Sequence, residues 1–264
     1  MKTNFLFLVF CVFSIGSAMA QNQGNSFNVQ FKDLVLNSHN GGVFLLGTDS
    51  KVYHTGFHYN NLAVANTTNN VVVSKMTGSC GGHGFFLSPI GILTNVTHES
   101  PQLRPVGTDW PFTPVTNYVV GDDIQNCAYW YLDNNSNIKN GTNADGSNVP
   151  PAKKTKLFVV NNNEFYMTDE MDDIYWWKPG MSAWSKLGTL KAKYLTKDHG
   201  ISTPLWFIGI DNMVYQVPNT GVAVAQNMNC KAKAIAVFGS QLYYVGLDGN
   251  YYVRIKNQDV RVRF

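Results

Sequence analysis

Apolar and polar residues alternate over short stretches along the whole chain, and one such stretch recurs. Its clearest copy covers residues 206–215 (WFIGIDNMVY). It returns at 243–252 (YYVGLDGNYY) and 44–53 (FLLGTDSKVY), with looser copies at 85–93, 129–138 and 165–175. Each copy is typical of a β-hairpin: a strand rich in β-branched and aromatic residues, a tight turn at Asp, Asn or Gly, and a returning strand.

The hairpins repeat with a period near forty residues. The turn aspartates, with Ile90 in the weakest copy, are separated by 36 to 43 residues; these positions are Asp49, Ile90, Asp133, Asp169, Asp211 and Asp248. A hairpin cannot bury both of its faces alone, so repeated units of this length must stack. The period predicts a single all-β domain over residues 33–264, a six-bladed β-propeller of four-stranded antiparallel blades. The second strands of the blades should contain Leu45, Phe86, Trp130, Tyr166, Phe207 and Tyr244.

Two segments interrupt the regular pattern. Residues 134–154 are rich in Asn, Gly and Ser and end at Pro150-Pro151, which predicts a long exposed loop. Residues 21–32 form a lead-in, and the alternation over 26–31 makes it a candidate strand for completing the last blade. The way the ring closes stays open at this point. Residues 260–264 (VRVRF) predict an outer edge strand that its arginines protect from pairing.

The N-terminus has the features of a secretory signal peptide over residues 1–20. Lys2 supplies the positive start, residues 5–15 the apolar core, and Ala18-Met19-Ala20 the cleavage site. We therefore expect a secreted, extracellular protein without membrane insertion, since no other apolar stretch is long enough to span a bilayer. Without Lys2, 19 basic residues face 17 acidic ones, a balance that indicates neither nucleic acid nor an anionic membrane as partner.

One repeat also resembles a known family. Trp184-Ser185-Lys186-Leu187-Gly188, followed by the hairpin of residues 205–216, resembles the tectonin repeat of tectonins, fish-egg lectins and tachylectin-type propellers. The resemblance implies a six-bladed ring that binds glycans or glycoproteins through several similar sites between blades, without catalysis and without a cofactor. The prediction is therefore a secreted lectin. The alternative is a structural, matrix or protein-interaction propeller.

The candidate glycan-binding residues are the turn aspartates and nearby aromatic residues. Asp211 and Tyr215 are the first choice and Asp248 and Tyr252 the second; the others are Asp49, Tyr53, Asp169, Tyr175 and Trp176. A structural alternative stands beside this interpretation. Aspartates often cap hairpin turns, and large aromatic side chains fill the cores between sheets. Trp176 should point to the opposite face of its strand from its two neighbours.

Three cysteines remain after removal of the signal peptide. Cys80 and Cys127 occupy the same place in consecutive blades, which predicts a disulfide between them and leaves Cys230 unpaired. Residues 78–82 (GSCGG) also match the nucleophile turn of picornaviral cysteine proteases, so a cysteine hydrolase that uses Cys80 is a remote alternative. Sequons predict glycosylation at Asn66, Asn95, Asn134 and Asn140.

Neither histidines nor acidic residues predict a metal site. His54 and His58 are four residues apart, but on a strand and its following loop they lie too far apart to share a metal. The acidic turn of residues 169–173 lacks the ligand spacing of a calcium loop.

Overall fold

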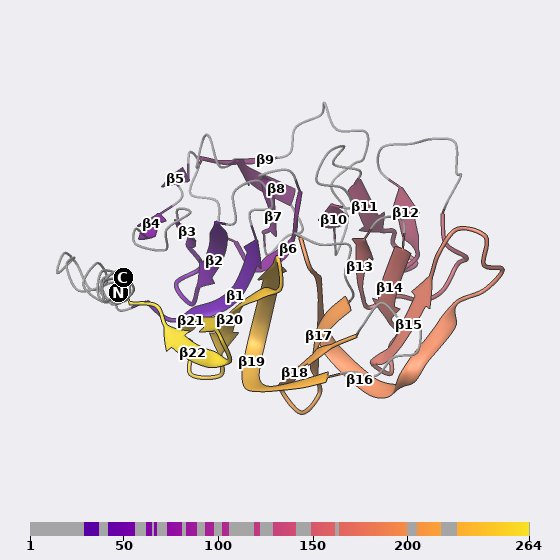
Figure 1. Ribbon diagram of the computed structural model, residues 1–264. Helices are drawn as coiled ribbons and strands as arrows, with labels where there is room; N and C mark the ends of the chain where they lie inside the picture. Colours follow the sequence, from indigo (N-terminus) through magenta and orange to yellow (C-terminus); the bar gives the residue numbers. More distant parts are fainter. Residues whose placement is uncertain are drawn as a thin grey trace, which may run out of the picture. The chain divides into compact units, whose positions relative to one another are not determined.

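The computed structural model describes residues 29–36, 42–55, 62–64, 66, 67, 73–80, 83–88, 93–97, 102–105, 119–121, 129–140, 149–161, 164–199, 205–217 and 226–263. All regular secondary structure among these residues is β-strand, which confirms the all-β class. Consecutive strands form antiparallel up-and-down ribbons (Figure 1). The signal peptide predicted over residues 1–20 lies outside the described residues.

The described strands pair in successive antiparallel groups, which we number 1 to 6. Group 1 holds β1 (Phe31–Leu36), β2 (Val43–Gly47), β3 (Val52–Thr55) and β4 (Leu62–Val64). Group 2 holds β6 (Lys75–Cys80), β7 (His83–Leu87), β8 (Leu93–Thr97) and β9 (Gln102–Pro105), with β5 (Asn66–Thr67) parallel to β9. Group 3 holds β10 (Val119–Gly121), β11 (Tyr129–Leu132) and β12 (Ile138–Asn140).

Groups 4 to 6 are joined by two long strands that bend from one group into the next (Figure 1). Group 4 holds β13 (Leu157–Asn161), β14 (Glu164–Thr168), β15 (Asp173–Trp177) and the first half of β16 (Ser185–Lys197). Group 5 holds the rest of β16, β17 (Leu205–Gly209), β18 (Met213–Gln216) and the first half of β19 (Gln226–Phe238). Group 6 holds the rest of β19, β20 (Gln241–Gly246), β21 (Tyr251–Ile255) and β22 (Gln258–Arg261).

The predicted equivalence of the second strands is confirmed. The residues chosen from the repeat all fall in the second strand of their group, which is β2, β7, β11, β14, β17 or β20; they are Leu45, Phe86, Trp130, Tyr166, Phe207 and Tyr244. An edge strand is present at the C-terminus, though at Gln258–Arg261 rather than at residues 260–264. Among the described residues this strand, β22, pairs with β21 only, and it is exposed along its length.

The core lies between neighbouring groups, because strand side chains alternate between the two faces of a sheet. β15 shows this clearly. Tyr175 and Trp177 pack toward a cluster shared by groups 3 and 4, while Trp176 packs toward a cluster shared by groups 4 and 5. The alternation predicted for these three residues is therefore confirmed, and each face of this sheet is buried against the next group.

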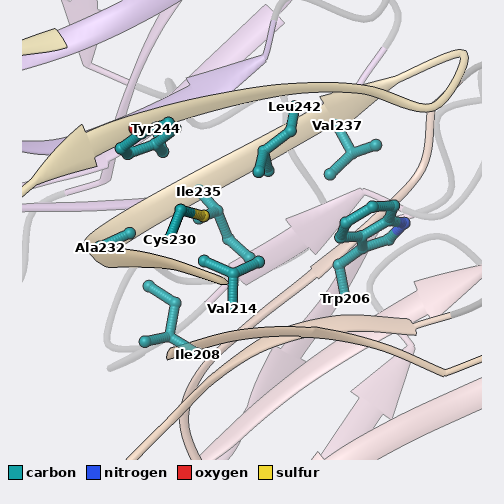
Figure 2. Close-up of a cluster of buried hydrophobic side chains, with 9 residues drawn as sticks. All are labelled: Trp206, Ile208, Val214, Cys230, Ala232, Ile235, Val237, Leu242 and Tyr244. Carbon is teal, nitrogen blue, oxygen red and sulfur yellow. The ribbon is translucent and has the colours of Figure 1, made fainter. Parts of the chain in front are cut away.

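Groups 5 and 6 share the cluster drawn in Figure 2, in which aliphatic side chains surround Trp206 and Tyr244. Cys230 belongs to this cluster as a buried free thiol, and burial raises its pKa to about 11. This agrees with leaving Cys230 out of the predicted bridge. Cys80 ends β6, but Cys127 lies outside the described residues, so the bridge itself stays a prediction.

The first strands of consecutive groups lie side by side. β1 neighbours β6, and the series continues through β10, β13, β16 and β19, which in turn neighbours β1. Among the described residues, backbone hydrogen bonds also join four pairs of neighbouring groups. In each, an amide near the start of one group donates to a turn carbonyl of the preceding group. The bonds join Thr155 to Ser136, Ala192 to Asp172, Ala232 to Asn212 and Phe31 to Gly249, at 2.9, 2.9, 3.0 and 2.8 Å.

One expectation differs from the structure. The loop expected over 134–154 contains β12, where buried Ile138 is the only apolar anchor of a strand too short to show alternation. At its other end, the Pro151 carbonyl accepts a hydrogen bond of 2.8 Å from the Trp184 indole. The candidate strand over residues 26–31 lies mostly outside the described residues and stays a prediction; of the described part, Phe31 begins β1 and the Gln30 side chain packs against Gly249. None of the described segments is a helix long and apolar enough to cross a membrane.

Candidate functional site

The turns between second and third strands share one backbone form in the groups where they are described. The amide of the fourth turn residue donates to the carbonyl of the first, as from Ser50 to Gly47 (3.0 Å) and from Asn212 to Gly209 (2.9 Å). The fourth residue has a positive φ; these residues are Ser50, Ser136, Asp172, Asn212 and Gly249. This is the type I turn followed by a left-handed residue that joins many hairpins.

In groups 1, 5 and 6 the third turn residue is an aspartate whose two carboxylate oxygens are both engaged. Oδ1 of Asp211 accepts from the Met213 amide at 3.0 Å, and Oδ2 accepts from the Tyr215 hydroxyl at 2.6 Å. The same pairs form in the other two groups, with hydroxyl bonds of 2.7 Å from Tyr53 to Asp49 and from Tyr252 to Asp248. The structure thus brings together the aspartate and tyrosine of the three predicted pairs.

Glycine at the first turn position makes room for this pair. A Cβ atom on Gly209 would lie 2.5 Å from Asp211 Oδ1 and 2.9 Å from Tyr215 Cε2, both too close for non-bonded atoms. Gly47 and Gly246 meet the same two atoms of their own pairs within 2.9 Å. We call this arrangement the glycine-first turn.

In groups 3 and 4 the aspartate that caps the turn comes from a different turn position. Asp169 is the first residue of its turn, not the third, and its Oδ1 accepts from the Met171 and Asp173 amides at 3.0 and 3.1 Å. Asp133 does the same for Asn135 and Asn137, at 2.9 Å each. The spacing of the repeat aligned Asp133 and Asp169 with the third-position aspartates of the other groups. That alignment was therefore wrong by two positions. We call this arrangement the aspartate-first turn.

Both turn types cap the same amide. That amide belongs to the residue after the left-handed one, namely Lys51, Asn137, Asp173, Met213 or Asn250. The side chain six residues after the first turn position also contacts the carboxylate in both types. It is a tyrosine in groups 1, 4, 5 and 6, whereas in group 3 Lys139 Nζ lies 3.9 Å from Asp133.

The electrostatics fix the protonation of these pairs. Burial would raise the pKa of Asp211, but hydrogen bonds from Tyr215 and the Met213 amide outweigh it and lower that pKa. The hydrogen bond to Asp211 is the largest of the causes that raise the pKa of Tyr215 to about 12. At neutral pH the aspartate is thus charged and the tyrosine neutral. Neither group is poised to exchange a proton in catalysis near pH 7.

Sequence reasoning missed a set of lysines beside these turns. In groups 1, 5 and 6 a lysine occupies the β-bulge at the start of the first strand; these are Lys32, Lys193 and Lys233. Lys193 donates to the Asn212 side chain and Lys32 lies 3.4 Å from Ser50 Oγ, so the lysine reaches the left-handed residue of its own turn. The signal was present in the sequence as a lysine 13 to 16 residues before the turn glycine of each group, at Lys32, Lys193 and Lys233.

Sequence reasoning also missed the apolar tips of three consecutive turns. Met171 is 66% exposed, Ile210 58% and Leu247 50%, in groups 4, 5 and 6. Leu190, 40% exposed, comes directly before Lys191, whose carbonyl accepts from the Ile210 amide at 3.3 Å. We call Met171, Leu190, Ile210 and Leu247 the tip surface.

The other predicted site residues are dispersed. Trp176 is half-buried in the core between groups, with Lys178 Nζ 5.7 Å from its ring centre. Asn134 is exposed in its turn and Asn140 half-buried in β12, while Asn66 and Asn95 lie in β5 and β8. His54 is half-buried in β3, and His58 lies outside the described residues. Within the described part of the chain, no three His, Cys, Asp or Glu side chains are placed to hold a metal ion.

No family model matches the sequence, and no curated protein matches it. Solved structures do resemble the chain. U3-55K has a TM-score of 0.58 at 8% identity, over 87% of this chain and 78% of that one. Human WBSCR16 has 0.54 at 10% identity, over 90% and 83%. Prp20p from Saccharomyces cerevisiae has 0.51 at 10% identity, over 84% and 74%. These are β-propeller proteins, and at such identities the likeness concerns the fold alone.

Proposed function

We propose that the chain is a six-bladed β-propeller that acts as a non-catalytic platform for binding proteins. Groups 1 to 6 are its blades, each with four strands when complete. The closed series of neighbouring first strands supports the ring, since β19 of group 6 lies beside β1 of group 1. The bond from the Phe31 amide to the Gly249 carbonyl, 2.8 Å long, supports closure by the same contact that joins groups 3 to 6 to one another.

The tip surface is the observation that carries the protein-binding part of this proposal. Hairpins between second and third strands end on the same side of a propeller, so Met171, Ile210 and Leu247 would lie along one arc of it. Exposed apolar side chains gathered at one place are typical of surfaces that bind other proteins. Carboxylates and lysines of the same turns would form the polar rim that such surfaces have.

Two similar structures favour the same function. The structure of Prp20p is described together with its binding to Gsp1p and histones, and yeast RCC1 (Prp20) has been solved bound to Kap60. The latter has a TM-score of 0.50 and 11% identity to this chain. Both structures are of the same yeast protein, a propeller that binds other proteins. Its partners are not proposed for this chain.

Site-specific cross-linking tests the platform with a matched control. A photo-crosslinkable residue is placed at Ile210 or Leu247, and in the control at Ile255 or Val260 of the outer hairpin, which are 41% and 38% exposed. The mature protein is irradiated in extracellular fluid of the organism that produces it, and adducts are identified by mass spectrometry. We expect a protein adduct from the tip positions and none from the outer hairpin. Equal adducts from both places, or none from the tips, would contradict the proposal.

Carbohydrate binding of the tectonin type is the second candidate, and one observation favours it. The Asp–Tyr pair recurs with the same geometry in groups 1, 5 and 6, and its aspartates Asp49, Asp211 and Asp248 are exposed to solvent. A carboxylate oxygen has two lone pairs, so each pair has capacity left to accept from a sugar hydroxyl. Binding to immobilised glycans that free sugar relieves, and that Asp211→Asn weakens, would establish this candidate.

A further inference from the structure

One carboxyl group touches first strands that are far apart in the sequence. Asp33 lies on β1, and its Oδ1 accepts from the Tyr194 hydroxyl of β16 at 3.2 Å. The Leu34 carbonyl is a second acceptor for that hydroxyl, at 3.0 Å. Oδ2 of Asp33 accepts from the Met76 amide of β6 at 3.3 Å. Asp33 therefore links β1 of group 1 to β6 of group 2 and to β16 of group 5.

Among the described residues, one charged side chain is found to act on Asp33. Lys75 on β6 is its cationic neighbour, and burial lowers the pKa of Lys75 while the charge of Asp33 raises it. Lys233 on β19 faces Asp248, Tyr244 on β20 faces Asp259, and the residues of β2 carry no titratable side chain. Lys32, on β1 itself, lies against Ser50.

Burial dominates the ionisation of Asp33. It raises the pKa of this carboxyl to about 6, although hydrogen bonds from Leu34, Tyr194 and Met76 and the charge of Lys75 oppose the shift. The Asp33 side chain is half-buried, and a carboxylate that is partly taken out of water is stabilised only in part by its partners. The neutral acid is consequently favoured in the folded protein far more than in the unfolded chain.

We infer that Asp33 forms a pH-sensitive clasp across the first strands, which holds β1, β6 and β16 together more firmly in mildly acidic solution than at neutral pH. This inference does not depend on the protein-binding proposal. Since the folded protein releases its proton at a higher pH than the unfolded chain, the stabilisation is complete below the unfolded value of 3.8 and is lost as pH rises through about 6. The ratio of folded to unfolded molecules should fall by about a hundredfold across this range because of Asp33.

His199 changes stability in the opposite sense and must be separated from Asp33. Burial lowers its pKa well below the usual value, so protonation of the unfolded chain weakens the fold as pH falls. Both proteins in a comparison of the parent with Asp33→Asn contain His199. The difference between their stabilities therefore isolates Asp33.

The first test is urea unfolding of the parent and Asp33→Asn at a series of pH values. We expect the urea midpoint of the parent, measured relative to that of Asp33→Asn, to fall as pH rises from about 4 to about 6 and to level off above that. A constant difference between the two midpoints over this range would overturn the clasp.

A second measurement covers the case in which Asp33→Asn does not fold. The ¹³C resonance of the Asp33 carboxyl reports its titration directly. In the parent we expect an inflection near pH 6, and in Tyr194→Phe a shift to higher pH because a donor to the carboxylate is lost. Tyr215→Phe, which removes a hydroxyl from a turn instead, should leave the inflection unchanged. An inflection near pH 4 in the parent, or the same inflection in Tyr194→Phe, would overturn the inference.

Discussion

The glycine-first turns of groups 1, 5 and 6 and the aspartate-first turns of groups 3 and 4 reach the same backbone geometry with different residues. In both, a carboxylate caps the amide after the left-handed residue, as at Met213 and Asp173. The carboxylate comes from the third position in one type (Asp211) and from the first in the other (Asp169). The fold thus requires a capped amide at this point, not an aspartate in a particular column of the repeat.

The difference also bears on function. An aspartate that recurs in a repeat suggests a ligand-binding role, but these aspartates already hold the turn and, in groups 1, 5 and 6, a tyrosine. The outermost side chains vary instead: Ile210 and Leu247 are apolar where Thr48 and Asn134 occupy the same turn position. We therefore look for binding specificity in the variable tips rather than in the repeated pair.

Gly209→Ala should have the largest effect. The added Cβ would displace the Asp211 carboxylate and the Tyr215 ring together, so we expect a loss of about 2 kcal/mol in the free energy of unfolding. Urea unfolding measures it. In an Asp211→Ala background the same substitution should cost clearly less, because one of the two clashing groups is gone; equal costs in both backgrounds would contradict the steric argument.

Exchanging the turn types sharpens the comparison. Gly209→Asp combined with Asp211→Met gives group 5 the residues that group 4 has at Asp169 and Met171. If the two turn types are equivalent, the double variant should be within about 1 kcal/mol of the parent, while Asp211→Met alone should be less stable. A double variant that is less stable than Asp211→Met would show that the turn types cannot be exchanged.

Asp211→Ala and Asp169→Ala should each lower the free energy of unfolding by about 1.5 kcal/mol. Each removes the cap from the same amide, and the bond to the following tyrosine is lost as well. Hydrogen exchange at the Met213 and Asp173 amides gives a local measurement. Faster exchange at only one of the two would mean that the caps are not equivalent.

Tyr215→Phe should cost about 1 kcal/mol, since the hydroxyl bond is lost while the ring stays stacked. The Phe207 and Tyr215 rings are 5.0 Å apart and nearly parallel. The variant should also raise the pKa of Asp211, which carboxyl ¹³C titration measures. An unchanged pKa in Tyr215→Phe would exclude the hydrogen bond as its cause.

The smallest effect is on acid stability. Hydrogen bonds outweigh burial and hold the pKa values of Asp211 and Asp248 below 3.8. Their contribution to stability is therefore present above pH 4 and is lost as pH falls through the lowered values. Asp211→Asn with Asp248→Asn should flatten the decline in unfolding free energy below about pH 4, by some tenths of a kcal/mol for each group. A decline as steep as in the parent would count against these two carboxylates.

Much of the fold could be predicted from the sequence, because the repeat carries it. Gly47, Gly209 and Gly246 stand at one spacing before an aspartate and a tyrosine, and alternation placed each second strand. The turn types could not be separated in the same way, since aspartate fits both positions and only the backbone bonds distinguish them. The strands of group 3 were the hardest to predict, because β12 has three residues and one buried apolar side chain.

The candidate site was predicted less well for a physical reason. The Asp–Tyr pairs are visible as a spacing, but the sequence does not show that each carboxylate oxygen already has a donor. Exposure of Ile210 and Leu247 depends on which turn residue points outward. Asp33 could not be singled out either, because its partners Met76 and Tyr194 come from other groups.

The most direct test of this account is a glycan array probed with the mature protein. On this account, the turn aspartates serve the fold and the tip surface serves binding. The protein should then show no retention on any glycan that free sugar can reverse, while it binds its protein partner through Ile210 and Leu247. Specific retention that free sugar relieves, and that Asp211→Asn abolishes without loss of folding, would contradict the account.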